Sequence, residues 1–172
     1  NAYSATTAQN LAQTRPSNPN SVDRSISKEE ELDQLISGSG KRVSTMLQLL
    51  KETAMRAGEA RRLEWIDIDF EKSIITVNNP EKSSSPRMWK VSQKLLECST
   101  ICLDKTSKSS TTTQPYSMKS TFQKTRKRLA TKLQNPRLLR ISFRTFRHWR
   151  ATQLYHETKD PYYVKQFLAT TA

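Results

Sequence analysis

The residues best suited to chemistry lie near the C-terminal end, where four arginines and one histidine occupy eleven positions. They are Arg140, Arg144, Arg147, His148 and Arg150. Arginine presents a planar fork of N–H donors that matches phosphate oxygens. Large apolar residues are interleaved with these arginines, so part of the segment should pack into a core and hold the guanidinium groups in place. Such a segment can clamp a phosphate in a phosphoryl-transfer site or on a DNA backbone. It can equally be a basic helix face that binds nothing in particular.

The composition favours a polyanionic partner. The chain has 172 residues and a formal net charge of +13, which is typical of a nucleic-acid-binding protein. It contains no apolar run of about eighteen residues, so an anionic membrane surface is a less expected partner than a nucleic acid. Cys98 and Cys102 have no further Cys or His nearby in the sequence, so two ordinary thiols on a helix are favoured over a zinc site. The expected compartment is the cytosol.

The chain divides into a polar arm and one predicted domain. Residues 1–24 contain almost no large apolar side chains, which predicts a linker or an arm. Residues 25–172 change between helical and strand periods, which predicts an α+β domain that is mostly α with a small antiparallel hairpin. Ser27 and Glu30 fit a capping box at the start of its first helix.

The spacing of apolar residues predicts the individual elements. The hairpin should pair residues 73–77 with 87–91 across a turn. Gly58 should interrupt the helical pattern, and the helix that begins at residue 115 should present a strongly basic face opposite its apolar stripe. That face is either a phosphate-contacting surface or an ordinary solvated one. The predicted helices run from the capping box to about residue 36, over 41–56, from Gly58 to 63, from 92 to about 103, over 115–133, from the arginine-rich segment to about 157, and onward from 161. The apolar stripe of the helix over 115–133 consists of Met118, Phe122, Leu129 and Leu133.

Two motifs resemble those of the tyrosine recombinases, the phage-integrase family. Thr53-Ala-Met-Arg56-Ala-Gly-Glu59 and the following Trp65-Ile-Asp67-Ile68 resemble the family's Thr-Gly-Leu-Arg-x-x-Glu box and its Trp-x-Asp-Ile strand entry. Residues 144–152, Arg-Thr-Phe-Arg-His-Trp-Arg-Ala-Thr, resemble its His-x-x-Arg-His-x-x-Ala-Thr box. The chain departs from the family at the first position of the second box, where Arg144 replaces histidine.

The resemblance implies a site assembled from distant segments. Arg56, Arg144 and Arg147 would bind the scissile phosphate, with Glu59 and His148 in support. An arginine stays protonated, so Arg144 could bind phosphate but would be a poor proton shuttle.

A lysine in the hairpin turn would donate a proton to the leaving group. Lys82 is the best match, and Arg87 and Lys90 on the returning strand are weaker ones. Thr170 falls where the family has His or Trp. The family's nucleophilic tyrosine follows that position and would lie beyond residue 172.

The resemblance also implies the reaction and its partners. Duplex DNA would be cut and rejoined through a 3′-phosphotyrosyl bond, without metal or cofactor, by a homotetramer in the full-length protein, while this fragment could be monomeric. The protein would act in the cytoplasm, at the nucleoid, and belong to a prokaryote or to a viral or plasmid element. A type IB topoisomerase and a non-catalytic DNA-binding regulator are the alternatives. The residues expected to contact DNA outside the catalytic set are Lys119, Arg126, Lys127 and Arg150.

Overall fold

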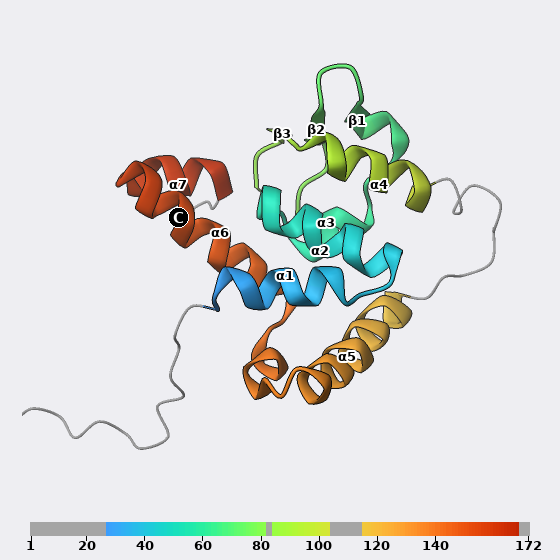
Figure 1. Cartoon of the computed structure of the whole chain (residues 1–172). Coiled ribbons are helices and arrows are strands. Elements are labelled where there is room, and N and C mark those ends of the chain that lie inside the picture. Colours follow the sequence, from blue (N-terminus) through green and yellow to red (C-terminus); the bar gives the residue numbers. More distant parts are fainter. Residues whose placement is uncertain (1–26, 82–83, 104–114, 169–172) are drawn as a thin grey trace, which may run out of the picture.

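The described residues form a mostly helical structure with one small sheet. The computed structural model describes residues 27–81, 84–103 and 115–168 (Figure 1). The α-helices are α1 (Glu29–Ser37), α2 (Lys41–Thr53), α3 (Ala57–Arg61), α4 (Gln93–Leu103), α5 (Pro115–Lys132), α6 (Phe143–Thr158) and α7 (Pro161–Leu168). The short elements are the 3-10 helices η1 (Trp65–Asp67) and η2 (Pro136–Arg140) and the strands β1 (Ile68–Asp69), β2 (Ile74–Val77) and β3 (Arg87–Lys90). The α+β, mostly α prediction is confirmed.

The three strands form an antiparallel sheet in the order β1-β2-β3. The predicted hairpin is confirmed as β2 and β3, in a register that places Ile75 opposite Trp89. Sequence reasoning did not separate β1, a two-residue strand that pairs with the start of β2. Side chains alternate between the faces of a strand, so Arg87 shares the buried face of β3 with Trp89. This alternation turns Arg87 into the protein.

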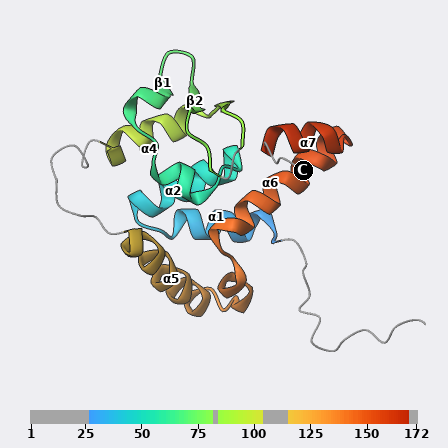
Figure 2. The ribbon, with the colours of Figure 1, turned by 180° about the vertical axis from the view of Figure 1, so that it is seen from behind.

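Helix α2 is the centre of the core. Its apolar residues recur at helical spacing and leave only part of its surface in contact with solvent. It packs against α1, α3, α4, α5 and α6. Figures 1 and 2, which view the molecule from opposite sides, both place the sheet on one side of α1 and α2 and α5 on the other. The buried residues of α2 are Val43, Met46, Leu47, Leu49, Leu50 and Thr53.

The structure corrects the predicted start of α1. The helix begins one residue later than expected, with Lys28 at the N-cap and Glu31 at N3. The Glu31 carboxylate accepts the Lys28 backbone N–H at 3.1 Å and forms a 2.8 Å ion pair with Arg137. The ion pair with a distant residue explains why Glu31 was preferred to Glu30 at the third position.

Three further corrections concern α2, α3 and α5. Helix α2 ends at Thr53 instead of continuing to Arg56, because Ala54 adopts a left-handed conformation with φ 53°. Gly58 does not interrupt the helical pattern but lies inside α3. Leu133 follows the end of α5 and is 42% exposed, so it does not extend the buried stripe.

The end of the described chain returns to the sheet. Asp160 caps α7 as predicted, because its side chain accepts the Tyr162 backbone N–H at 2.8 Å. Phe167 packs partly buried against the core, and its ring lies 6.3 Å from that of Trp89 in an edge-to-face arrangement. This contact carries the C-terminal end of α7 to β3. Within the described ranges, no helix is both long enough and apolar enough to cross a membrane.

Candidate functional site: an arginine cluster

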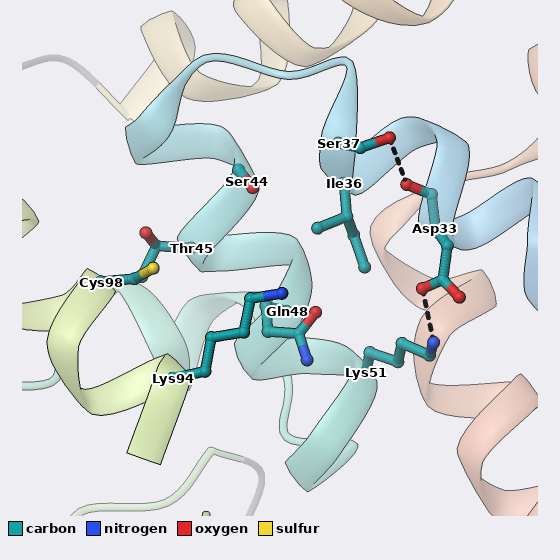
Figure 3. A pocket seen from close by; sticks show the side chains of 9 residues that line it. All are labelled: Asp33, Ile36, Ser37, Ser44, Thr45, Gln48, Lys51, Lys94 and Cys98. Atoms are coloured by element: carbon teal, nitrogen blue, oxygen red, sulfur yellow. Dashed lines mark hydrogen bonds and ion pairs between the residues drawn. The ribbon is translucent and has the colours of Figure 1, made fainter. Parts of the chain in front are cut away.

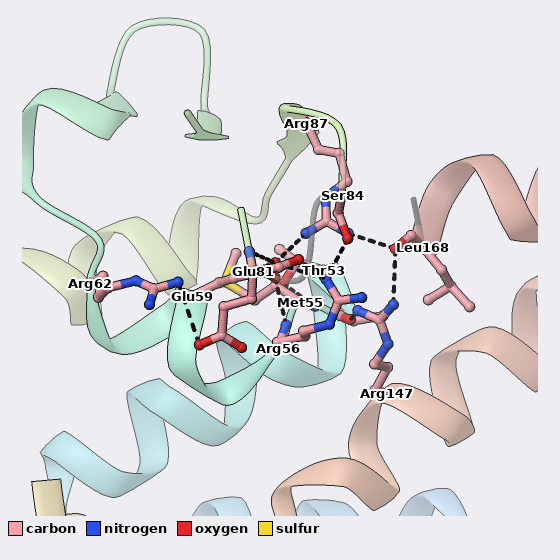
Figure 4. Close-up of polar contacts among 11 residues, drawn as sticks. Thr53, Met55, Arg56, Glu59, Arg62, Glu81, Ser84, Arg87, Arg147 and Leu168 are labelled. Atoms are coloured by element: carbon pink, nitrogen blue, oxygen red, sulfur yellow. Dashed lines mark hydrogen bonds and ion pairs between the residues drawn. The ribbon is translucent and has the colours of Figure 1, made fainter. Parts of the chain in front are cut away.

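Arg56 lies in the short turn between α2 and α3. It is the N-cap residue of α3, and its backbone N–H donates to Glu59 at 2.8 Å. The same guanidinium nitrogen, Nη1, donates to Glu59 at 3.1 Å, to the Glu81 carbonyl at 3.0 Å and to the Ser84 hydroxyl at 2.7 Å (Figure 4). The side chain stays 20% exposed. Arg56 is therefore fixed by the hairpin but accessible to a ligand.

Glu59 is the buried anion of the site, with 2% of its surface exposed. Besides Arg56, it accepts the Glu81 backbone N–H at 3.1 Å and a hydrogen bond from Arg87 at 2.7 Å. Burial by itself raises the pKa of a carboxyl group. The backbone hydrogen bonds from Arg56 and Glu81, the charge of Arg87 and the side-chain hydrogen bond from Arg56 outweigh it, so the pKa of Glu59 is lowered. Glu59 thus remains a carboxylate at neutral pH and stabilises two of the arginines.

Arg147 joins the site from α6. Its Nη1 donates to the Ala54 carbonyl at 2.8 Å and its Nη2 to the Leu168 carbonyl at 2.9 Å. Burial and the positive charges of Arg56 and Arg87 lower the pKa of Arg147 to about 10. Arg147 is hydrogen-bonded to neutral carbonyls and repelled by the neighbouring guanidinium groups. Binding of an anion beside it would offset this repulsion.

Arg87 is a third member of this cluster. Sequence reasoning considered it only as a weak candidate for proton donation. The structure places it in the interior, with 7% of its side chain exposed, an ion pair of 2.7 Å to Glu59 and its guanidinium carbon 5.1 Å from the ring centroid of Trp89. Its Nη1 donates to the Leu168 carbonyl at 2.6 Å. Burial lowers its pKa, Glu59 raises it and Arg56 lowers it further.

The charges of the cluster do not cancel. Three guanidinium groups, Arg56, Arg87 and Arg147, surround one carboxylate, that of Glu59, which leaves an excess of two positive charges. Figure 4 shows these side chains converging from the N-terminal end of α3, from β3 and from α6. Fixed cations in excess at a partly exposed position attract a phosphate group and need little reorganisation to bind it.

Arg144 and His148 lie on α6 beside the cluster. Arg144 is exposed and donates its Nε–H to Nε2 of His148 at 2.9 Å. The charge of Arg144 also contributes to lowering the pKa of Arg147, so the two arginines are electrostatically coupled. In the described structure, no hydrogen bond joins Arg144 to Arg56 or Glu59.

The four residues expected to contact DNA elsewhere differ in their surroundings. Lys119 and Lys127 are exposed on α5. Arg126 is half-buried, donates to the Ile141 carbonyl and stacks over the Phe122 ring.

Arg150 likewise has partners within the protein. It forms a 3.5 Å ion pair with Glu157, and its guanidinium carbon lies 6.0 Å from the centroid of the Phe167 ring. Lys82 and Thr170 lie outside the described residues, so their predicted roles are not tested. The hairpin residues on either side of Lys82, Glu81 and Ser84, both bond to Arg56.

Sequence reasoning missed two contributors to the site and the role of a third. The Ser84 hydroxyl and the Leu168 carbonyl accept hydrogen bonds from the arginines, and Arg87 binds Glu59. The alternating pattern of β3 contained a signal for Arg87, because it places this residue on the same face as the apolar Trp89. A backbone carbonyl such as that of Leu168 is common to every residue and gives no sequence signal.

No group of three or more Cys, His, Asp or Glu side chains that could hold a metal ion occurs in the part of the chain that the structure describes. A separate hollow of about 400 Å³ lies between α1, α2 and α4 (Figure 3). Its walls include Asp33, Lys51, Lys94 and Cys98, and it shares no lining residue with the arginine cluster.

Comparisons with known proteins agree with this architecture. The chain is similar to the XerA recombinase crystal structure, with 19% identity, 92% of this chain and 59% of that chain covered, and a TM-score of 0.70. It is also similar to the XerH site-specific recombinase bound to its difH substrate in a pre-cleavage complex, with 19% identity, coverage of 85% and 47%, and a TM-score of 0.62. The chain thus spans about half to three-fifths of the length of these proteins.

A search of curated protein sequences found no match. The sequence model of the Phage integrase family matches residues 26–170, which is most of the chain and includes every residue of the arginine cluster. The chain therefore belongs to the phage integrase family, and its fold is that of a tyrosine recombinase catalytic domain.

Proposed function

We propose that this chain is the catalytic domain of a site-specific recombinase or integrase that cuts and rejoins duplex DNA. The observation that carries the proposal is the convergence of Arg56 and Arg147, which are distant in sequence, in a cluster with an excess of positive charge. The XerH structures contain DNA substrates before and after cleavage, which supports DNA as the substrate here. The excess of basic residues over the whole chain supports the same substrate.

In this proposal, Arg56 and Arg147 bind the non-bridging oxygens of the scissile phosphate. Both are held by backbone carbonyls and, for Arg56, by Glu59, so their positions are set before the substrate arrives. Donors that are positioned in advance contribute about 3 kcal/mol each to transition-state stabilisation in comparable sites. Arg144 adds a third contact on the exposed side of α6.

In the first chemical step a tyrosine hydroxyl loses its proton to solvent and its oxygen bonds to phosphorus, while the bond from phosphorus to the 5′ oxygen breaks. The electron pair of the broken bond stays on the 5′ oxygen, which takes a proton from Lys82. In the second step a 5′ hydroxyl gives its proton back to Lys82 and attacks phosphorus. The bond from phosphorus to the tyrosine oxygen breaks, and that oxygen takes a proton from solvent. Because the phosphotyrosyl bond keeps the energy of the phosphodiester, no cofactor is required. The tyrosine lies outside these 172 residues, and Thr170 occupies the place of the family's His or Trp.

The partners follow from the same proposal. Residues 1–24 connect the domain to a DNA-clamping domain, and copies of the full protein assemble as a tetramer on DNA. Lys119 and Lys127 contact phosphates outside the scissile position, while Arg150 and Arg126 contribute through the packing of α6 and α5. The protein acts in the cytoplasm, at the nucleoid.

A suicide-substrate assay tests the reaction. The product of the full gene, alongside the 172-residue chain, is incubated with nicked duplex DNA that carries the candidate site, and covalent adducts are resolved on a denaturing gel. We expect an adduct from the full product, and its loss in Arg56→Lys and Arg147→Lys, which keep the charge but not the fork of donors. Arg62→Lys is the matched control, because Arg62 is an exposed arginine that pairs with Glu81 at 3.4 Å.

The other outcomes separate the alternatives. Tight binding without any adduct would favour a DNA-binding regulator. Relaxation of supercoils without strand exchange would favour a topoisomerase. An adduct with the 172-residue chain would mean that Tyr155, Tyr162 or Tyr163 is the nucleophile, since these are exposed tyrosines of α6 and α7.

A further inference from the structure

The C-terminal end of α7 is bound by two arginines of the cluster. The Leu168 carbonyl accepts hydrogen bonds from Arg87 at 2.6 Å and from Arg147 at 2.9 Å. The last carbonyls of a helix have no partner within the helix and carry the negative end of its dipole. Two cationic donors on one such carbonyl therefore form a favourable contact, and Figure 4 shows Leu168 facing both arginines.

Arg87 also reaches the opposite side of the site. Its Nη2 donates to the Glu59 carboxylate, which in turn accepts from Arg56. The buried guanidinium of Arg87 thus connects Glu59, which positions Arg56, to the C-terminal end of α7. Packing holds it in this position, because it stacks on Trp89, whose ring contacts Phe167 of α7.

We infer that Arg87 is a positioning residue that couples the seating of α7 to phosphate binding at Arg56 and Arg147. The inference rests on the proposed function, in which a DNA phosphate binds these arginines and the chain after α7 leads to the nucleophile. Arg147 shares the Leu168 carbonyl with Arg87, so a phosphate that orders Arg147 also orders α7. Coupling between two binding events is reciprocal, so a seated α7 strengthens phosphate binding in turn.

The two bonds of Arg87 require a guanidinium group. Its nitrogens Nη1 and Nη2 donate hydrogen bonds to two acceptors at once, the Leu168 carbonyl and the Glu59 carboxylate. A lysine has one ammonium nitrogen on a flexible stem and would keep the charge near Glu59 without bridging both acceptors. Arg87→Lys therefore removes the bridge between the two acceptors but keeps the positive charge.

A merely structural role would give a different result from a positioning role. If Arg87 only neutralised Glu59, Arg87→Lys would preserve that role and leave α7 unchanged. If Arg87 served overall stability, its loss would loosen all elements alike. Only the positioning role predicts a change confined to α7 and to the response of the site to DNA.

Amide hydrogen exchange of the 172-residue chain, followed by mass spectrometry with and without a 20-base-pair duplex, tests the inference. In Arg87→Lys we expect about tenfold faster exchange in residues 161–168 of the free protein, since one charge-assisted hydrogen bond is lost. We also expect loss of the protection that DNA confers on α7 in the wild type. Arg62→Lys, the control, should match the wild type in both states.

A second variant approaches the coupling from α7. Phe167→Leu removes the ring contact with Trp89 and leaves the Arg87–Glu59 pair intact. By reciprocity it should reduce the protection that DNA confers on residues 53–59. This variant decides the question if Arg87→Lys does not fold.

Several results would overturn the inference. They are unchanged exchange in α7 of Arg87→Lys, equal acceleration of α2 and α7, or full DNA protection at residues 53–59 in Phe167→Leu. Failure of the proposed function is recognised separately, because Arg56→Lys and Arg147→Lys would then bind the duplex with wild-type affinity and protection. In that case faster exchange in α7 of free Arg87→Lys would still establish the positioning of the helix, and the coupling to phosphate would be refuted.

Discussion

Arg144 donates its Nε–H to Nε2 of His148, one turn further along α6, at 2.9 Å. The acceptor nitrogen must be unprotonated, so the imidazole is neutral in this arrangement. Burial, together with the charges of Arg144 and Arg147, lowers the pKa of His148 below its usual value of 6.5. The pair orients Arg144, the residue that replaces the family's histidine, toward the exposed side of the site.

This pair predicts a pH dependence of stability. Because the pKa of His148 is lower in the folded protein, the unfolded chain binds the proton more tightly. The free energy of unfolding should therefore be highest above pH 6.5 and fall as the pH decreases below that value toward the folded-state pKa. His148→Gln, which keeps an acceptor for Arg144, should flatten this part of the profile.

Urea unfolding at pH 5, 6, 7 and 8 measures the effect. His156, the second histidine of the chain, is exposed near the other end of α6, so His156→Gln is the matched control. A slope that survives in His148→Gln but disappears in His156→Gln would contradict the assignment.

The Glu59 carboxylate predicts a larger effect. Glu59→Gln removes the buried anion between Arg56 and Arg87 while preserving its size. Loss of one partner from a buried ion pair costs about 3–5 kcal/mol, and the partial exposure of Arg56 favours the lower end of that range. Denaturation by urea at pH 7 checks the value, with the exposed-partner variant Glu157→Gln, which removes the Arg150 ion pair, as the control.

The same variant should alter the acid limb of the stability profile. The pKa of Glu59 is lowered, so its contribution is present above the unfolded-state value of 4.5 and is lost as the pH falls through the folded-state value. The wild type should lose its advantage over Glu59→Gln below about pH 4.5. An advantage that persists unchanged at pH 3 would show that the carboxylate charge does not stabilise the cluster.

Much of the fold and part of the site were accessible from the sequence. The two boxes contain Arg56 and Arg147, and helical periodicity placed α2, α5 and α6 within a few residues. One long-range contact and one local backbone conformation account for the errors in the helix ends. The Glu31–Arg137 ion pair moved the start of α1, and the left-handed turn at Ala54 ended α2 early, so that Arg56 became a cap instead of a continuing helix residue.

The surroundings of the basic residues were harder to predict. Composition and spacing show that α5 is basic but do not distinguish a residue that faces solvent from its neighbour that faces η2 and α6. Arg126 and Lys127 are adjacent in sequence, yet the first bonds to the Ile141 carbonyl and the second is exposed. Whether a basic residue of α5 stabilises the fold depends on a nearby backbone carbonyl, and the sequence does not show where that carbonyl lies.

This difference predicts opposite effects for the two residues. Lys127→Gln should leave the free energy of unfolding nearly unchanged. If Lys127 contacts a phosphate, the slope of log affinity for duplex DNA against log salt should decrease by about one. Arg126→Gln should mainly lower stability, by about 1–3 kcal/mol, because it leaves the buried Ile141 carbonyl without its charged donor.

Fluorescence anisotropy with labelled duplex DNA at four salt concentrations, paired with thermal unfolding, checks both effects. The two variants remove the same charge, so each serves as the control for the other. Reversed results, with Arg126→Gln changing only the salt slope, would mean that Arg126 leaves the Ile141 carbonyl to bind DNA.

Lys51 of α2, which lines the hollow between α1, α2 and α4, gives a further prediction. Its ammonium pairs with Glu29 at 2.9 Å and Asp33 at 2.5 Å and lies 5.1 Å from the ring centroid of Trp149. The lysine side chain is 13% exposed, but both carboxylates are 53% exposed and well solvated, so the ion pairs contribute modestly. Lys51→Met keeps the apolar stem and should cost about 1–2 kcal/mol in total, the sum of weak ion pairs and one cation–π contact.

Salt separates these two contributions. The exposed ion pairs are screened as ionic strength rises, whereas the contact with the Trp149 ring is not. The cost of Lys51→Met, measured by urea unfolding, should therefore shrink between 0.05 M and 0.5 M NaCl without reaching zero. Lys94→Met, which removes the same charge from the opposite wall of the hollow, should show little cost at either concentration. A cost that is independent of salt would assign the stabilisation to the ring contact alone, because only the carboxylates of α1 are exposed enough to be screened.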